Sequence, residues 1–243
     1  MAIRRSSGTS SAALLAGALA LACASKPAAP APDSGFLPEP ERMTEQRDRF
    51  PFDRVWVSPD YVRDRYTRLW IKPVNTDHLM NMDWYDQSTA QHVKIREGAN
   101  LLARYMHNAF RTAIYYDPNK RYTLVEQVDP RTLILEMAIV EVTPNDATLG
   151  ALGLVLPPLR RAGEKGSVAM EGRIRDGETQ EILGMFADRE EARQRVLDPK
   201  AVTWWGHSEA IIDVWAKELV KLINTPPDFT VQEESPSFSL QPW

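Results

Sequence analysis

The spacing of hydrophobic positions along the chain predicts two long helices. Within residues 89 to 115, Leu102, Met106 and Phe110 recur at three- and four-residue intervals and so fall on one face of a helix. A similar apolar stripe, with charged residues opposite it, predicts a second helix over residues 203 to 223. Each helix therefore has one face that must be buried against another element.

Alternation of polar and apolar positions predicts about five strands. The first three are expected at residues 68 to 74, 122 to 126 and 132 to 142. The third of these is apolar on both faces, which is typical of a central strand. Residues 167 to 175 alternate strictly, and after a turn residues 182 to 187 return, which predicts a β-hairpin with one face in water.

The order of these elements predicts an α+β fold. An antiparallel or mixed sheet of about five strands, with two main helices packed on one side, would bury the apolar faces. We expect one domain over residues 36 to 224, in which the weakly periodic residues 36 to 65 wrap the core. Residues 225 to 243 contain several prolines and no sustained period, so we expect a loose C-terminal tail there.

The first 22 residues have the pattern of an export signal. Arg4 and Arg5 precede an apolar run over residues 12 to 22. A run of this length is too short to span a bilayer, which takes about 20 residues, but it suits the apolar region of a signal peptide. We therefore expect residues 1 to 22 to be removed on export.

Residues 19 to 25 resemble the lipobox of bacterial lipoproteins, and Cys23 is the only cysteine of the chain. We expect lipidation at Cys23, followed by a Pro- and Ala-rich tether that ends at residue 35. Ala20 stands where a lipobox usually has leucine, so an ordinary signal peptide is the alternative. Ala24 is not the aspartate that commonly retains lipoproteins in the inner membrane. The resemblance therefore implies the outer membrane, with the domain facing the periplasm.

Charge and composition exclude several classes of partner. The chain has 29 Lys and Arg residues against 33 Asp and Glu, a net charge of −4 at pH 7. A nucleic-acid-binding domain carries a basic face, so we expect no nucleic acid partner. The four histidines have no short chelating spacing, so we expect no metal. No nucleophile elbow, phosphate loop or dinucleotide fingerprint occurs, which favours a protein that is not an enzyme and uses no cofactor.

Several segments, in the right order and over most of the expected mature chain, resemble a family of bacterial lipoproteins known as domain of unknown function 3313. The segments are Ser34-Gly35-Phe36-Leu37, residues 166 to 176, residues 179 to 183, Asp188-Arg189-Glu190 and residues 205 to 216. The resemblance implies a lipoprotein but no activity. The order of elements is also similar to that of periplasmic transport-accessory and secretion lipoproteins, which is a likeness of fold and not of function.

The segment from residue 143 to residue 166 joins two predicted strands and is too apolar for a disordered linker. We interpret it as a surface that binds a protein partner or a membrane. The alternative is that its leucines fold back onto the core or form a short helix. The residues expected to bind a partner are Leu149, Leu152, Leu154, Val155, Leu156, Arg160 and Arg161.

Four acidic residues near the predicted hairpin are candidates for a catalytic site. Glu171, Asp176, Asp188 and Glu190 could cluster there, and paired carboxylates can hydrolyse glycans. The alternative is a solvated strand face on which acids and arginines pair across strands.

Three functions are consistent with these features. The first is a non-enzymatic binding or scaffolding role in the cell envelope, such as a transport accessory, with the membrane and an envelope protein complex as partners. The second is an envelope hydrolase that uses the four carboxylates. The third is a lipoprotein that binds a lipid or small molecule in a cavity between helices and sheet.

Overall fold

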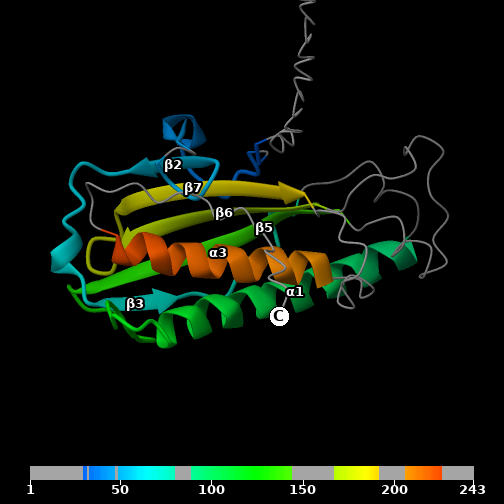
Figure 1. Cartoon of the computed structure of the whole chain (residues 1–243). Helices are drawn as coiled ribbons and strands as arrows, with labels where there is room; N and C mark the ends of the chain where they lie inside the picture. The colour runs from blue at the N-terminus through cyan, green and yellow to red at the C-terminus, as the bar shows by residue number, and fades with distance from the viewer. Residues whose placement is uncertain are drawn as a thin grey trace, which may run out of the picture.

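The computed structural model describes residues 30–31, 33–46, 49–79, 89–143, 167–191 and 206–225. These residues form one sheet and two long helices (Figure 1). The strands are β1 (Thr44–Glu45), β2 (Arg54–Val57), β3 (Arg68–Ile71), β4 (Thr123–Leu124), β5 (Thr132–Thr143), β6 (Ser167–Asp176) and β7 (Ile182–Glu191). The helices are α1 (Thr89–Tyr115) and α3 (Gly206–Asn224), with short 3-10 turns η1 (Pro40–Arg42) and η2 (Arg63–Arg65).

The seven strands lie in the order β1-β2-β7-β6-β5-β3-β4. All neighbours are antiparallel except β3, which runs parallel to both β4 and β5. Because α1 carries the chain back between β3 and β5, these two strands can run in the same direction. The α+β class, the mixed sheet and the two helices are confirmed.

The sheet is larger than the expected five strands. The two additional strands, β1 and β2, come from the weakly periodic residues 36 to 65, and β2 pairs with β7 over four residues. Two and four residues are too few to produce a readable alternation, because a period of two needs several repeats. The segment therefore wraps the core as expected, but it also extends the sheet.

Both helices lie side by side across one face of the sheet (Figure 1). The bounds of α1 coincide with the predicted residues 89 to 115. The core between helices and sheet contains Leu102, Met106 and Phe110 from α1 and Trp215 from α3, packed on the inward residues of β5, β6 and β7. Burial of large side chains of this kind stabilises a fold by about 1.5 to 3 kcal/mol each. In the described part of the chain, neither helix combines the length and apolar character needed to cross a bilayer.

The opposite face of the sheet is covered by an N-terminal segment that we call the strap, residues 30–31 and 33–43. The strap buries Ala31, Phe36, Leu37 and Met43 against this face, on the side away from the helices (Figure 1). The expectation that one hairpin face lies in water is therefore wrong. The strap also includes residues 30–31 and 33–35 of the segment that composition alone suggested was a tether.

The sheet beneath the strap is lined by small or flexible apolar side chains. They are Ala138, Val140, Ala169, Met185 and Ala187, with Trp56 and Ile182 at the margin. Small residues let the backbone of the strap approach the sheet closely. Apart from the short turn η1, the strap can therefore pack as an irregular chain that forms no α-helix or strand.

Gly172 in β6 provides a test of how tightly the helix-facing core is packed. Its register partner on β7 is Phe186, whose ring lies 2.2 Å from the position that a Cβ of residue 172 would take. The ring stacks on Phe52 at 4.8 Å between centroids and is itself buried, so it has little room to move. We expect Gly172→Ala to lower the free energy of unfolding by about 1 to 3 kcal/mol, measured by urea denaturation.

Gly184→Ala is the matched control in the neighbouring strand. A Cβ there meets no atom closer than 3.5 Å, which is ordinary van der Waals contact. We expect this variant to unfold at nearly the wild-type urea concentration. Equal destabilisation of the two variants would show that strand glycines matter here for backbone reasons and not for the contact with Phe186.

Candidate functional site

The strap is held by a buried carboxylate. Glu171 lies in β6 on the strap face and is 0% exposed. Its Oε2 accepts a hydrogen bond of 2.6 Å from the Ser34 hydroxyl, and its Oε1 accepts one of 3.2 Å from the Ser34 backbone N–H. Gly35 follows with φ +83°, a left-handed conformation that glycine adopts without strain. Hydrogen bonds to a charged acceptor are about twice as strong as neutral ones, so this contact anchors the middle of the strap.

A second attachment holds Phe36. Arg173, two residues after Glu171 on the same face of β6, donates from Nη1 to the Phe36 carbonyl at 2.9 Å. The same guanidinium lies 4.6 Å from the centroid of the Phe36 ring, and the edge of the His78 ring approaches it at 5.5 Å between centroids. Arg173 also pairs with Glu136 of β5 at 2.6 Å. Phe36 is therefore fixed through both its backbone and its ring.

The start of the strap is attached to β2. Arg54 donates from Nη2 to the Ala31 carbonyl at 2.9 Å and to the Asp33 carboxylate at 2.7 Å. Together with Glu171 and Arg173, this makes three attaching side chains within six residues of the strap, from Ala31 to Phe36. We call these contacts of Arg54, Glu171 and Arg173 with the strap the clamp.

A second group of acids lies on the opposite, helix-facing side of the sheet. Asp188 of β7 accepts a hydrogen bond of 3.1 Å from the Asp53 backbone N–H and another from the Trp215 indole N–H. Both aspartates are only 3% exposed, beneath α3. Burial, and then the negative charge of Asp53 beside it, raise the pKa of Asp188 well above its usual value.

Two close carboxyls, one of which has a raised pKa, are a known catalytic arrangement, but this pair is buried and closed to substrate. A substrate must reach the reacting groups, and Trp215 and Phe52, each 1% exposed, pack around this region of the core. The described geometry therefore favours a structural role, in which Asp188 holds a proton and positions the Trp215 indole.

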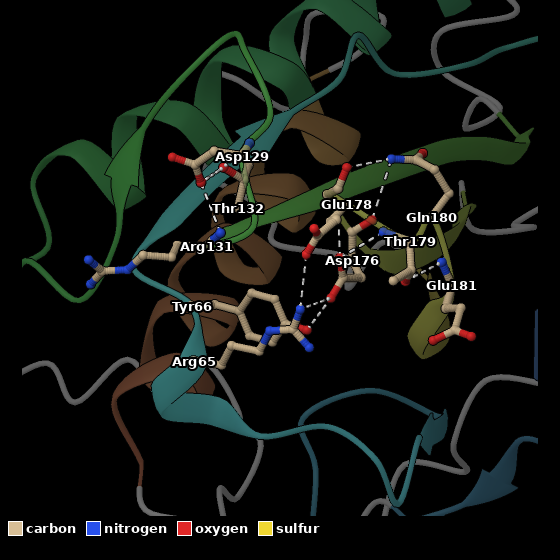
Figure 2. A network of polar contacts seen from close by, with 11 residues as sticks. Arg65, Tyr66, Asp129, Arg131, Thr132, Asp176, Glu178, Thr179, Gln180 and Glu181 are labelled. Atoms are coloured by element: carbon tan, nitrogen blue, oxygen red, sulfur yellow. Dashed lines mark hydrogen bonds and ion pairs between the residues drawn. The ribbon is translucent and has the colours of Figure 1, made fainter.

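A third acid closes the β6–β7 turn. Figure 2 shows Asp176 facing the Tyr66 hydroxyl, which donates to it at 2.6 Å. The backbone N–H groups of Glu178 and Thr179 donate to the other carboxylate oxygen at 2.7 and 3.0 Å. Burial tends to raise the pKa of Asp176, but these hydrogen bonds outweigh it, and its pKa is lowered. Arg65 lies 3.6 Å from the same carboxylate.

The four acids considered as a catalytic cluster do not form one site. Glu171 faces the strap, Asp176 is at the turn, and Asp188 faces the helices, with the charge of Glu190 near it. Successive side chains of a strand point to opposite faces, so proximity along the hairpin did not bring these groups together. The arginines do pair with acids across strands, as Arg173 and Glu136 show.

An open groove of about 330 Å³ lies between α1 and the segment that follows β3. Its lining is Pro73, Val74, Asn100, Ala103, Arg104, His107 and Asn108. His107 Nε2 lies 3.2 Å from the Ile71 carbonyl, which is the hydrogen-bonded role expected of an isolated histidine. This groove is open to the surface and does not lie in the core between the helices and the sheet, where a ligand cavity was expected. Among the described residues, no three potential metal ligands lie together.

The residues expected to bind a partner lie outside the described part of the chain, as does Cys23. This applies to Leu149, Leu152, Leu154, Val155, Leu156, Arg160 and Arg161, and their role stays a prediction.

Conversely, sequence reasoning did not identify the clamp or the pairing of Asp53 with Asp188. One signal was present: small apolar residues such as Ala169 and Ala187 alternate with the charges on the face expected to be wet, which indicates that something packs there.

These features define a class of protein: an α+β domain whose single mixed sheet is covered by two helices on one face and by a clamped N-terminal strap on the other. The chain belongs to the family described as protein of unknown function (DUF3313), whose model matches residues 32–219. The matched region begins within the strap and ends within α3, so the strap is part of the family's domain.

Comparison with solved structures finds only distant similarity. A PelC dodecamer from Paraburkholderia phytofirmans matches with a TM-score of 0.36 and 7% identity, over 68% of this chain and 94% of that one. Protein XCC0632 from Xanthomonas campestris, of family DUF330, matches with a TM-score of 0.32 and 13% identity, over 71% and 91%. Comparison with curated proteins finds no match.

The clamp predicts a specific effect of removing Glu171. We expect Glu171→Ala to lower the free energy of unfolding by about 1 to 3 kcal/mol, because the half-buried N–H and hydroxyl of Ser34 lose their acceptors. We also expect faster hydrogen exchange of the strap amides than of those in β5, measured by mass spectrometry. Glu178→Ala removes the same charge from an exposed position of the same hairpin and should change neither quantity. Unchanged strap exchange in Glu171→Ala would show that the apolar contacts alone hold the strap.

Asp188 and Asp176 predict opposite dependences of the free energy of unfolding on pH. The folded-state pKa of Asp188 lies above its unfolded value of about 4, so the folded protein retains a proton that the unfolded chain releases. Its contribution to the free energy of unfolding therefore falls as the pH rises above about 4 towards the folded pKa, by at most about 1.4 kcal/mol per pH unit. We expect Asp188→Asn to flatten this slope in urea unfolding measured from about pH 4 to pH 8.

Asp176→Asn is the matched comparison. The pKa of Asp176 is lowered on folding, so its contribution is present above the unfolded pKa and is lost as the pH falls through the folded pKa. We expect this variant to lose stability at neutral pH and to approach the wild type in acid. A slope that persists in Asp188→Asn would assign the loss of stability at higher pH to other groups.

Proposed function

We propose that this protein is a lipoprotein, anchored in the outer membrane through Cys23, whose periplasmic domain has a non-enzymatic binding or scaffolding role in the cell envelope. The observation that carries the proposal is the clamped strap. The described part of the strap begins at residue 30, seven residues after the cysteine of the lipobox-like segment. The clamp holds the start of the strap to β2 through Arg54, and it holds Ser34 and Phe36 to β6 through Glu171 and Arg173.

This arrangement suits a domain that works at a membrane surface. A lipid on Cys23 holds the chain end at the bilayer, and stable attachment is favoured when more than one acyl chain inserts. The clamp then joins the anchored end to the core through charge-assisted hydrogen bonds, most of them partly buried. A domain attached in this way stays close to the membrane while its other surfaces remain free to bind.

The binding role is supported by the composition of residues 149 to 161. An apolar stretch with two arginines is typical of a surface that contacts a protein partner, and a transport-accessory role is one form of this. The hydrolase alternative has less support, because Glu171, Asp176 and Asp188 each have a separate structural contact. Binding of a lipid or small molecule keeps a candidate place in the groove beside α1.

The anchor is tested by substituting the cysteine in the native host. We expect Cys23→Ser to abolish incorporation of labelled palmitate and to move the protein from the outer-membrane fraction to the soluble periplasm. Ala24→Asp is the matched control, because it keeps the cysteine and introduces the residue that commonly retains lipoproteins in the inner membrane. Palmitate incorporation that persists in Cys23→Ser, or wild-type protein that fractionates as soluble, would contradict the proposal.

The same cells test the binding role. Crosslinking of intact cells, followed by purification of the lipidated protein, should recover a specific envelope protein from the wild type and not from a deletion of residues 146 to 162. The deleted residues lie outside the described part of the fold, and retained urea stability of the variant is the control for folding. Recovery of the same partner from both proteins would exclude this segment as the binding surface.

A further inference from the structure

The point where the strap leaves the domain limits how the domain can lie on a membrane. Ala31 is buried on the strap face, and its carbonyl accepts from Arg54 of β2. Pro30, the preceding residue, is exposed. The first described residues of the strap therefore lie on the side of the sheet opposite α1 and α3 (Figure 1).

The length of chain between Pro30 and Cys23 is short. Seven peptide units separate the two residues. A chain spans at most about 3.6 Å per residue when fully extended, so Pro30 lies within about 25 Å of a lipidated Cys23 in any conformation of the intervening residues. Full extension also costs conformational entropy, so the usual separation is shorter.

The thickness of the domain is comparable to this limit. Stacked layers of secondary structure lie about 10 Å apart, and a helix with its side chains is about 10 Å across, so the outer surface of α1 and α3 is about 20 Å from the strap side. If the helices faced the membrane, the linking chain would have to cover that height and also pass around an edge of the sheet. A link of seven peptide units, at most about 25 Å long, is too short for this path.

We propose that the strap side of the sheet faces the lipid surface and that α1 and α3 face away from it. This inference rests on the proposed lipidation of Cys23. The partner is the headgroup region of the bilayer, because the exposed strap residues, such as Glu39, Glu41 and Arg42, are charged and remain in water. The tether imposes the orientation, so it does not depend on attraction between charges.

The clamp fixes the strap to the sheet, so the orientation of the strap relative to the membrane is also the orientation of the whole domain. If the strap peeled away from the sheet, residues 30 to 43 would lengthen the tether and the domain could turn freely. Glu171, Arg173 and Arg54 oppose this by holding the strap at three points. The helix layer, with the groove beside α1, is then the surface presented to partners away from the membrane.

The only cysteine of the chain becomes unreactive once it carries lipid, so an introduced cysteine is the sole free thiol. The experiment places a fluorescent donor on Glu41→Cys in the strap or on Lys217→Cys in α3, both exposed positions. The full-length lipidated proteins are incorporated into vesicles of phosphatidylethanolamine and phosphatidylglycerol that carry an acceptor dye on their headgroups. The mass of each purified protein first establishes that Cys23 is lipidated.

We expect energy transfer to be several-fold more efficient from Glu41→Cys than from Lys217→Cys, and to stay so at high salt. Insertion of about twenty Gly and Ser residues after Lys26 is the matched control, because it lengthens the tether without touching the clamp. The difference between the two positions should then disappear. Equal transfer in the unextended proteins, or stronger transfer from Lys217→Cys, would overturn the orientation while leaving the anchor intact. A mature chain without lipid on Cys23 would instead overturn the proposed function and this inference together.

Discussion

The fold depends on covering both faces of its central strands. Strand β5 is buried along nearly its whole length on both sides, and so is most of β6 and β7. Two helices cover one face, and among the described residues the irregular strap covers the other. Because the strap has no hydrogen-bonded secondary structure spanning the sheet, its position depends on the clamp, above all on the two hydrogen bonds from Ser34 to Glu171. A fully buried carboxylate is costly unless it is satisfied, so the strap and Glu171 require each other.

Two buried acids, Asp176 and Asp188, have pKa values that are shifted in opposite directions, because hydrogen-bond donors oppose the effect of burial at Asp176 and a neighbouring carboxylate adds to it at Asp188. Asp176 and Asp188 are both nearly inaccessible, and burial acts on both in the same direction. Asp176 receives three donors and its pKa is lowered, whereas Asp188 lies beside a second aspartate and its pKa is raised. The first acid stabilises a turn as an anion. The second fits under α3 because it can hold a proton, which avoids placing two adjacent negative charges in the core.

The sequence was sufficient for the long elements and insufficient for the contacts between distant segments. A stripe of apolar residues over 27 positions defined α1, and a strand apolar on both faces was correctly expected to be central. Strands of two and four residues gave no period, so β1 and β2 were missed. Glu171 was read as solvent-facing because charged residues alternate around it. Its partner, Ser34, is 137 residues away, and no local pattern connects two positions at that separation.

The clamp also explains why a short tether is useful in the proposed lipoprotein. A flexible attachment limits only the distance of a domain from the membrane, whereas a short one attached to a fixed point also limits its rotation. A short attachment limits rotation only if the attachment point does not move. An irregular segment is easily displaced when a force acts on its end. The polar contacts of Arg54, Glu171 and Arg173 distribute such a force over β2 and β6, which are two strands of the same sheet. The interactions that cover the core are therefore the same ones that would orient the domain.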